Sequence, residues 1–128
     1  MAANLTNYGA QQHLASRLSY YLGLNTGDPG QSGSANEVGA GVGYTRQACT
    51  LTAGTLAQRN ATNGSIITFG PASGAGFGTV AYCTLWDASS GGNAWWYGPI
   101  TNKAIVAGDS YTVPVGYITV TLPASINP

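Results

Sequence analysis

Charged side chains are scarce in this chain. Only eight of its 128 residues are charged, or 6%, whereas about 25% is typical of globular domains. The four cations and four anions give a formal net charge of zero, so little electrostatic repulsion opposes association between copies. Four scattered cations also cannot form the basic stripe that binds nucleic acid. The polar surface must come from uncharged side chains. It is therefore either covered by neighbours in an assembly, which we favour, or a neutral carbohydrate-binding surface.

Long apolar runs are missing as well. No stretch approaches the ~20 apolar residues of a membrane-spanning helix, and residues 1–7 lack the basic region of a secretion signal. We therefore expect no membrane partner and assembly in a cytoplasm. Two cysteines and the single histidine, His13, are too few to form a zinc site, so we expect no metal and no cofactor.

The two cysteines are Cys49 and Cys83. A reducing cytoplasm keeps thiols reduced, so we expect both to be free and buried. A cross-strand disulfide is the alternative, because both cysteines lie in strand-like segments.

Few residues of this chain could act in catalysis. General acid–base chemistry needs two titratable groups in one pocket, but the four carboxylates lie far apart in the sequence. Each of the three aspartates stands beside glycine, proline, serine or alanine, where aspartate commonly closes turns through its own side chain. No serine has the Gly-x-Ser-x-Gly surroundings of a hydrolase nucleophile. We predict no catalytic residues and no enzyme activity. The four carboxylates are Asp28, Glu37, Asp87 and Asp109.

The patterning predicts a mainly β fold with a short N-terminal helix. Leu14 and Leu18 have helical spacing, and Thr6 or Asn7 can cap a helix over residues 7–18, with Gln11 on its polar face. Short strand-like segments separated by turn residues follow, about eight in all. We predict one domain over residues 1–128, a single antiparallel β-sandwich of jelly-roll type. The expected strands are 20–24, 44–51, 65–69, 79–87, 94–97, 103–106, 110–113 and 115–122.

Two segments are expected to lie outside the strands. Residues 31–43 form a long glycine-rich loop, and loops of this length are usually functional or mobile. The tail, residues 123–128, begins and ends with proline and cannot continue a strand ladder. The tail either lies over a neighbouring subunit or stays loose. In the last strand, Ile118, Val120 and Leu122 are expected to face the core.

A tryptophan pair, Trp95 and Trp96, is the most conspicuous aromatic feature. Adjacent side chains of a regular strand point to opposite faces, so one ring is expected in the core and the other outside. An outward ring can anchor a subunit interface or stack on a sugar beside Asn93 and Asp87, and both rings can also be covered within the domain.

Several segments, in order, resemble a family of small bacteriophage virion proteins usually labelled phage tail fibre proteins. They are residues 21–30 (YLGLNTGDPG), 37–38 (EV), 43–48 (GYTRQA), 78–82 (GTVAY), 85–93 (LWDASSGGN) and 107–110 (AGDS).

The resemblance implies a non-enzymatic component of the virion, either a tail fibre protein or a protein that decorates or cements the capsid. The implied partners are the major capsid protein or tail proteins, and copies of the chain itself. A carbohydrate-binding module that adsorbs to a host glycan is the alternative. Glu37 and Arg46 bracket the long loop and are expected to pair at its base, so that the loop can mould itself onto a neighbour. Candidate contact residues are Trp95, Trp96, Glu37 and Arg46.

Overall fold

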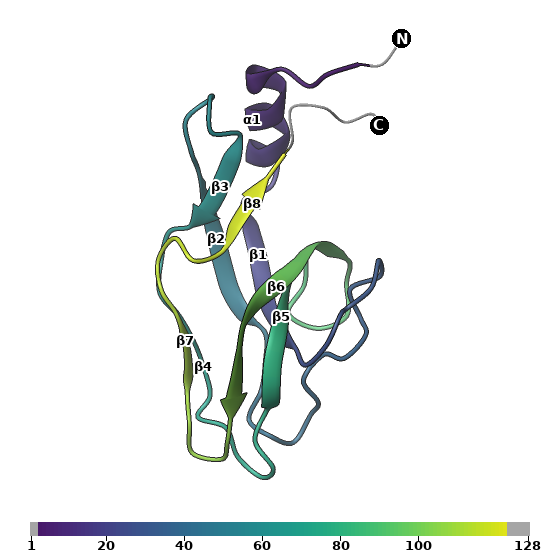
Figure 1. The fold of residues 1–128 in the computed structure, drawn as a ribbon, viewed down its shortest axis with the longest axis vertical. Coiled ribbons are helices and arrows are strands. Elements are labelled where there is room, and N and C mark those ends of the chain that lie inside the picture. Colours follow the sequence, from purple (N-terminus) through teal and green to yellow (C-terminus); the bar gives the residue numbers. More distant parts are fainter. Residues whose placement is uncertain (1–2, 123–128) are drawn as a thin grey trace.

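A computed structural model describes residues 3–122 and shows one helix and eight strands there (Figure 1). The elements are α1 (Asn7–Ala15), β1 (Ser19–Asn25), β2 (Gln47–Ala53), β3 (Asn60–Asn63), β4 (Ile67–Phe69), β5 (Gly78–Trp86), β6 (Ala94–Ile105), β7 (Tyr111–Val113) and β8 (Thr119–Thr121).

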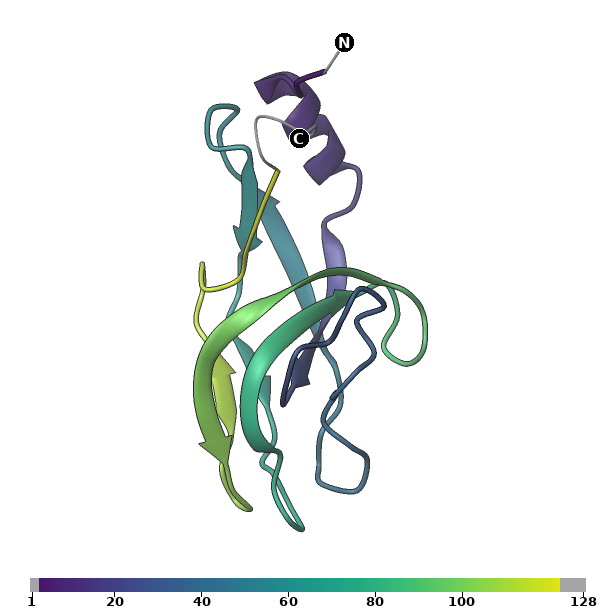
Figure 2. The ribbon, with the colours of Figure 1, turned by 45° about the vertical axis from the view of Figure 1, so that its right-hand side comes forward.

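All strand pairs are antiparallel. Six strands form one sheet in the order β6-β5-β1-β2-β3-β8, and β4 pairs with β7 in a second sheet. Figure 2 shows that β5 and β6 of the larger sheet are strongly curved. The mainly β prediction with a short N-terminal helix is confirmed. The jelly-roll sandwich is not confirmed, because the second sheet has only two strands.

One apolar core connects the two sheets. Leu22 and Leu24 of β1 are fully buried, and Leu22 lies opposite Leu85 of β5. Phe69 of β4 and Val113 of β7 close the same core from the smaller sheet. Alternation along each strand brings these side chains to one face.

The helix begins where predicted and ends earlier. Thr6 is the N-cap, with the Gly9 amide donating to its hydroxyl at 3.0 Å. The helix ends at Ala15 instead of residue 18, because Ser16 caps it and β1 starts at Ser19. The expectation that Gln11 lies on a polar face is wrong. Its side chain is buried and donates hydrogen bonds to two carbonyls of the β2–β3 connection.

Three strands differ from prediction. The polar strand β3 was not predicted, since its sequence NATN has low strand propensity and the strand forms by pairing with both β2 and β8. Residues 94–97 and 103–106 are parts of one strand, β6. Pro99 lies between these two parts. Proline is tolerated because β6 is an edge strand, and the ladder is irregular between Val80 and Tyr82 of β5.

The last predicted strand, 115–122, is shortened to β8. Residues 114–117 form a turn instead, in which the Tyr117 amide donates to the Pro114 carbonyl and Gly116 has a φ of +81°. Ile118 and Val120 are buried as predicted, and Leu122 is only partly buried. The tail prediction concerns residues 123–128, which lie outside the described residues.

The long loop packs on its own sheet. The Val38 amide donates to the carbonyl of Leu24, and the side-chain amide of Asn25 donates to the carbonyl of Ala35 at 3.0 Å. Gly33 lies so close to β6 that a Cβ added to it would be 2.3 Å from the Cβ of Ala94. The loop therefore covers one face of the sheet with ordered contacts.

Both cysteines are free and buried, so the preference for thiols over a disulfide is confirmed. Cys49 lies opposite Tyr20 and Cys83 lies opposite Leu24, on the two strands that flank β1. Two strand spacings, about 9.6 Å, separate β2 from β5, too far for a disulfide. Burial raises the pKa of Cys49 to about 11 and that of Cys83 to about 12.

Candidate functional site

The carboxylate of Glu37 and the guanidinium of Arg46 form a two-point ion pair at the base of the long loop. Arg46 donates from Nε to Oε2 at 2.8 Å and from Nη2 to Oε1 at 2.9 Å. The Tyr44 hydroxyl donates to the same carboxylate at 2.7 Å and accepts the Leu24 amide at 3.0 Å. The pair is therefore more enclosed than an exposed surface pair, which alone contributes little.

Arg46 also reaches the turn between β5 and β6. Its Nη1 donates to the carbonyls of Ala88 at 3.1 Å and Gly91 at 2.8 Å. Its guanidinium lies over the indole of Trp86, 3.7 Å from the ring centroid. Arg46 thus connects the long loop to the 87–93 turn, and these contacts serve the fold of the chain itself. Contact of Glu37 or Arg46 with another subunit stays a prediction.

The cluster shifts the acidity of its members. Burial alone would raise the pKa of Glu37, but the hydrogen bonds from Arg46 and Tyr44 outweigh it and lower the pKa below its usual 4.5. Burial, together with the hydrogen bond to Glu37, raises the pKa of Tyr44. Glu37 is therefore held as a carboxylate and Tyr44 as a neutral donor.

The tryptophan pair lies at a β-bulge. Leu85 pairs with Trp96 while the next residue, Trp86, pairs with Ala94, so Trp95 is an extra residue in β6. The bulge changes the regular alternation of side chains. Both rings consequently line one hollow of about 350 Å³. Regular alternation along the strand had predicted that they point to opposite faces.

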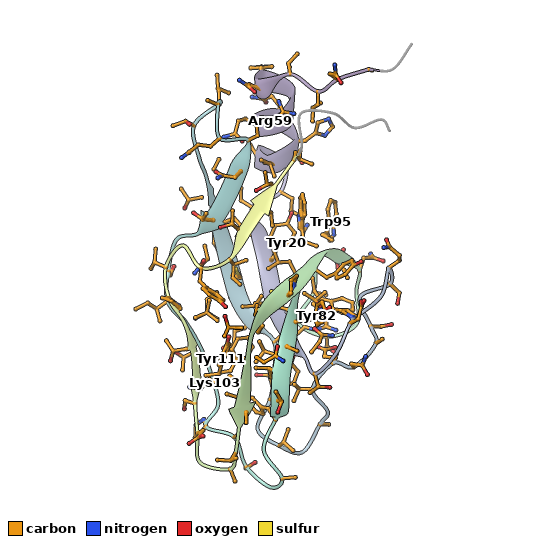
Figure 3. The ribbon with its side chains drawn as sticks, in the orientation of Figure 1. Tyr20, Arg59, Tyr82, Trp95, Lys103 and Tyr111 are labelled. Carbon is orange, nitrogen blue, oxygen red and sulfur yellow. The ribbon has the colours of Figure 1, made fainter. Side chains whose placement is uncertain are left out.

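Tyr20 of β1 contacts both tryptophans. Trp96 is partly buried and donates from its indole to the Tyr20 hydroxyl at 3.2 Å. Trp95 is 54% exposed, and its ring centroid lies 6.4 Å from that of Tyr20 in an edge-on arrangement (Figure 3). The guanidinium of Arg17 lies 5.3 Å from the Tyr20 centroid and 5.5 Å from the Trp95 centroid. Trp96 therefore supports the fold, and Trp95 is the available ring.

Polar groups flank the exposed ring. Asp87 accepts the indole N–H of Trp95 at 3.3 Å, the Asn93 amide at 2.8 Å and the Asn93 side chain at 3.2 Å. The hydrogen bonds from Asn93 and Trp95 lower the pKa of the Asp87 carboxyl. An exposed aromatic ring beside an acid and an amide is the arrangement that the sugar-binding alternative requires.

A larger groove lies between the two edge strands of the six-stranded sheet. It has a volume of about 700 Å³, and β6 and the segment 117–121 form its sides. Its floor includes the buried core residues Leu85, Ile118 and Val120. Tyr117 crosses the groove, with its hydroxyl accepting the Thr101 amide at 3.1 Å. No local sequence pattern predicts this groove, because the groove depends on how far the sheet curls.

Side chains that bind metals do not gather in the described part of the chain. Within residues 3–122, no three histidine, cysteine, aspartate or glutamate side chains lie together in a way that could hold a metal ion. Asp28 accepts the Gly30 amide at 2.8 Å, as expected of an aspartate that closes a turn. In the same residues, no helix has the length and apolar character needed to cross a membrane.

Known protein families provide the decisive comparison. Residues 2–121 match the family described as "Podophage GP4 fiber I protein gp80". The chain belongs to this podophage fibre family. No curated protein matches the chain. The family places the chain among the components of the bacteriophage virion, as a fibre-type protein, so the resemblance to phage tail fibre proteins is confirmed.

Membership in the fibre family gives the Arg46 cluster a context. Glu37, Tyr44, Arg46 and Trp86 all fall in the segments that carry the resemblance, and the fold brings them together around one guanidinium. The role of Trp95 is different, since it points outward at a bulge beside these segments. The cluster holds the fold, whereas the Trp95 ring and the groove lie open at the surface.

Proposed function

We propose that this fibre-family chain is a non-enzymatic structural subunit on the outside of the podophage particle, held by contacts with other virion proteins and copies of itself. The observation that carries the proposal is where the exposed apolar side chains lie. Of eight large exposed apolar residues among those described, four lie on β6 or the segment leading into β8. These four are Trp95, Tyr97, Val115 and Tyr117.

The low charge supports the same conclusion. A surface with few charges carries little hydration that must be lost when it is covered by a neighbour. A formal net charge of zero means that copies approach one another without net repulsion. We place the subunit in a tail fibre, in keeping with the family, and regard decoration or cementing of the capsid as the alternative position.

A matched pair of variants tests the proposed contact side. Val115 is 58% exposed beside β8, and Ile66 is 65% exposed before β4. Val115→Asp should reduce incorporation into particles about tenfold, because a charge in an interface core is strongly disfavoured. Ile66→Asp should leave incorporation unchanged. Equal incorporation of both variants would overturn the assignment of the contact side.

Imaging of particles separates the two positions. Particles carrying a tagged copy of the chain, examined by electron microscopy with a gold label, should show label at the tail. Label spread over the head would favour capsid decoration instead. Particles without any label, from a tagged chain that folds and is expressed, would contradict the structural role.

The exposed Trp95 ring favours host-glycan binding as a second candidate function. An aromatic face offers a stacking surface for a sugar ring, while Asp87 and Asn93 can bond its hydroxyls. Trp95→Ala should abolish binding of host polysaccharide, measured by titration calorimetry, without lowering the melting temperature much. Leu56→Ala, another exposed apolar residue, is the control. Failure of the unaltered chain to bind the polysaccharide would remove this candidate.

A further inference from the structure

The two edges of the six-stranded sheet face each other across the groove. In the order β6-β5-β1-β2-β3-β8, each end strand has a neighbour on one side only. Residues of both end strands line the same groove of about 700 Å³. The sheet is thus curled toward a barrel, and its two free edges lie on the two sides of one opening.

β6 and β8 are not paired with each other across this opening. Tyr117, just before β8, bridges it by a side chain, with its hydroxyl accepting the Thr101 amide at 3.1 Å. One additional strand between β6 and β8 would give each edge a second neighbour. Addition of a strand to an exposed edge is a general way for proteins to bind extended peptides.

The lining of the groove selects for an uncharged occupant. None of its lining residues is charged, and its floor is the apolar core itself. A charged segment would lose its hydration there without gaining a partner. The occupant must therefore be an extended segment with one apolar face and no charge.

We propose that the groove binds residues 123–128 of a neighbouring copy of this chain. The segment Pro-Ala-Ser-Ile-Asn-Pro has no charge, and in an extended conformation Ala124 and Ile126 would face the core while Ser125 and Asn127 face outward. The flanking prolines cannot donate to a ladder and limit pairing to the four residues between them. Six groove-lining residues of β6, 96–101, form an edge of similar length, in which Pro99 has no amide hydrogen and an entering strand would replace the Tyr117 hydroxyl at the Thr101 amide.

A neighbour's segment fits better than the chain's own. The segment begins at the end of β8, and that strand runs toward α1 (Figure 1). To lie beside β8 in the groove, the chain's own segment would have to reverse its direction in a turn directly after Leu122. A segment donated by another copy needs no turn. This inference rests on the proposed function, since it supplies the contact that joins copies.

The first experiment compares the full chain with a chain that ends at Leu122. Both should give the same circular dichroism spectrum, and the shortened chain should self-associate about tenfold more weakly in sedimentation equilibrium. Ile126→Asp in the full chain should reproduce this loss. A synthetic peptide of residues 123–128 should bind the shortened chain, and the same peptide carrying Ile126→Asp should not.

The second experiment alters the groove. Thr119→Lys places a charge in the groove, and Thr112→Lys places the same charge on β7 as a control. Both threonines are exposed, so neither change is expected to prevent folding. Thr119→Lys should weaken self-association and Thr112→Lys should not. The shortened chain mixed with Thr119→Lys should associate, since one supplies an intact groove and the other an intact segment.

The outcomes separate the two proposals. If the shortened chain associates as strongly as the full chain, the segment does not occupy the groove, while the proposed function stands provided Val115→Asp still impairs incorporation. If the full chain is a monomer whose shortened form binds the peptide, the occupant is the chain's own segment and the inference is wrong. If the full chain neither associates nor enters particles, both proposals fail.

Discussion

The guanidinium of Arg46 lies 3.7 Å from the centroid of the Trp86 ring. In this position it holds Glu37 on one side and the carbonyls of the 87–93 turn on the other. Planar stacking with several directed hydrogen bonds is a combination that arginine provides and lysine does not.

Replacement of Arg46 should therefore be costly. Arg46→Ala leaves the partly buried carboxylate of Glu37 without its cation and should lower the free energy of unfolding by about 2–3 kcal/mol. Arg46→Lys keeps the charge but loses the stacking and the fork geometry, and should cost about 1–2 kcal/mol. Urea denaturation measures both, with exposed Lys103→Ala as the control. Equal stability of Arg46→Ala and the control would show that the cluster is dispensable.

The lowered pKa of Glu37 predicts a loss of stability in acid. A carboxylate whose pKa is lower in the folded state contributes stability that is fully present above its unfolded value, near the usual 4.5. This contribution disappears as the pH falls through the folded-state pKa. Melting temperatures should decline over this interval less steeply in Glu37→Gln than in the unaltered chain. Part of the slope should remain, because the pKa of Asp87 is lowered as well. Identical slopes would contradict the assignment to Glu37.

Two glycines, one in the long loop and one just before it, allow the cost of backbone strain to be distinguished from the cost of a steric clash. Gly33 and Gly30 have φ angles of +75° and +71°, but only at Gly33 would a Cβ meet another atom, the Cβ of Ala94 at 2.3 Å. Gly30→Ala should cost about 1 kcal/mol of stability from the backbone alone. Gly33→Ala should cost about 2–3 kcal/mol, since the loop must move off β6. Thermal unfolding compares them, and equal losses would show that the loop does not pack closely.

Asn63 holds β8 in place. Its buried side chain donates to the carbonyls of Ser65 and Pro114, both at 2.9 Å, and accepts the Ile118 amide at 2.8 Å. Asn63→Ala leaves these groups unpaired and should lower the free energy of unfolding by about 3 kcal/mol. Exposed Asn102→Ala should stay within about 0.5 kcal/mol of the unaltered chain. Hydrogen exchange at Ile118 should accelerate in Asn63→Ala alone; unchanged exchange would contradict this role.

Much of the fold was predictable because it depends on local patterns. The capping threonine, the strands β1 and β5, and the inward-facing Ile118 and Val120 are all visible in short windows of sequence. The polar strand β3 was not predictable, since its residues pair only because β2 and β8 lie on either side. The continuity of β6 through Pro99 was not predictable either, because an edge position is a property of the sheet.

The candidate site shows the same division. Pairing of Glu37 with Arg46 followed from their positions around the loop, but the stacking on Trp86 did not, because those residues lie 40 positions apart. The tryptophan pair is visible directly in the sequence as two adjacent residues. Its true geometry depends on a bulge in the β5–β6 ladder, which no local signal revealed.

The sequence by itself determined the β-rich class, the helix start, the scarcity of charge and the membership in the fibre family, because these reside in composition, short-range spacing and ordered motifs. Only the tertiary structure decided which surfaces are left open. The curl of the sheet sets the two edges β6 and β8 across one groove, and the bulge brings Trp95 to the same hollow as Trp96. Both result from pairings between residues distant in the chain, whose geometry depends on all of the strands together.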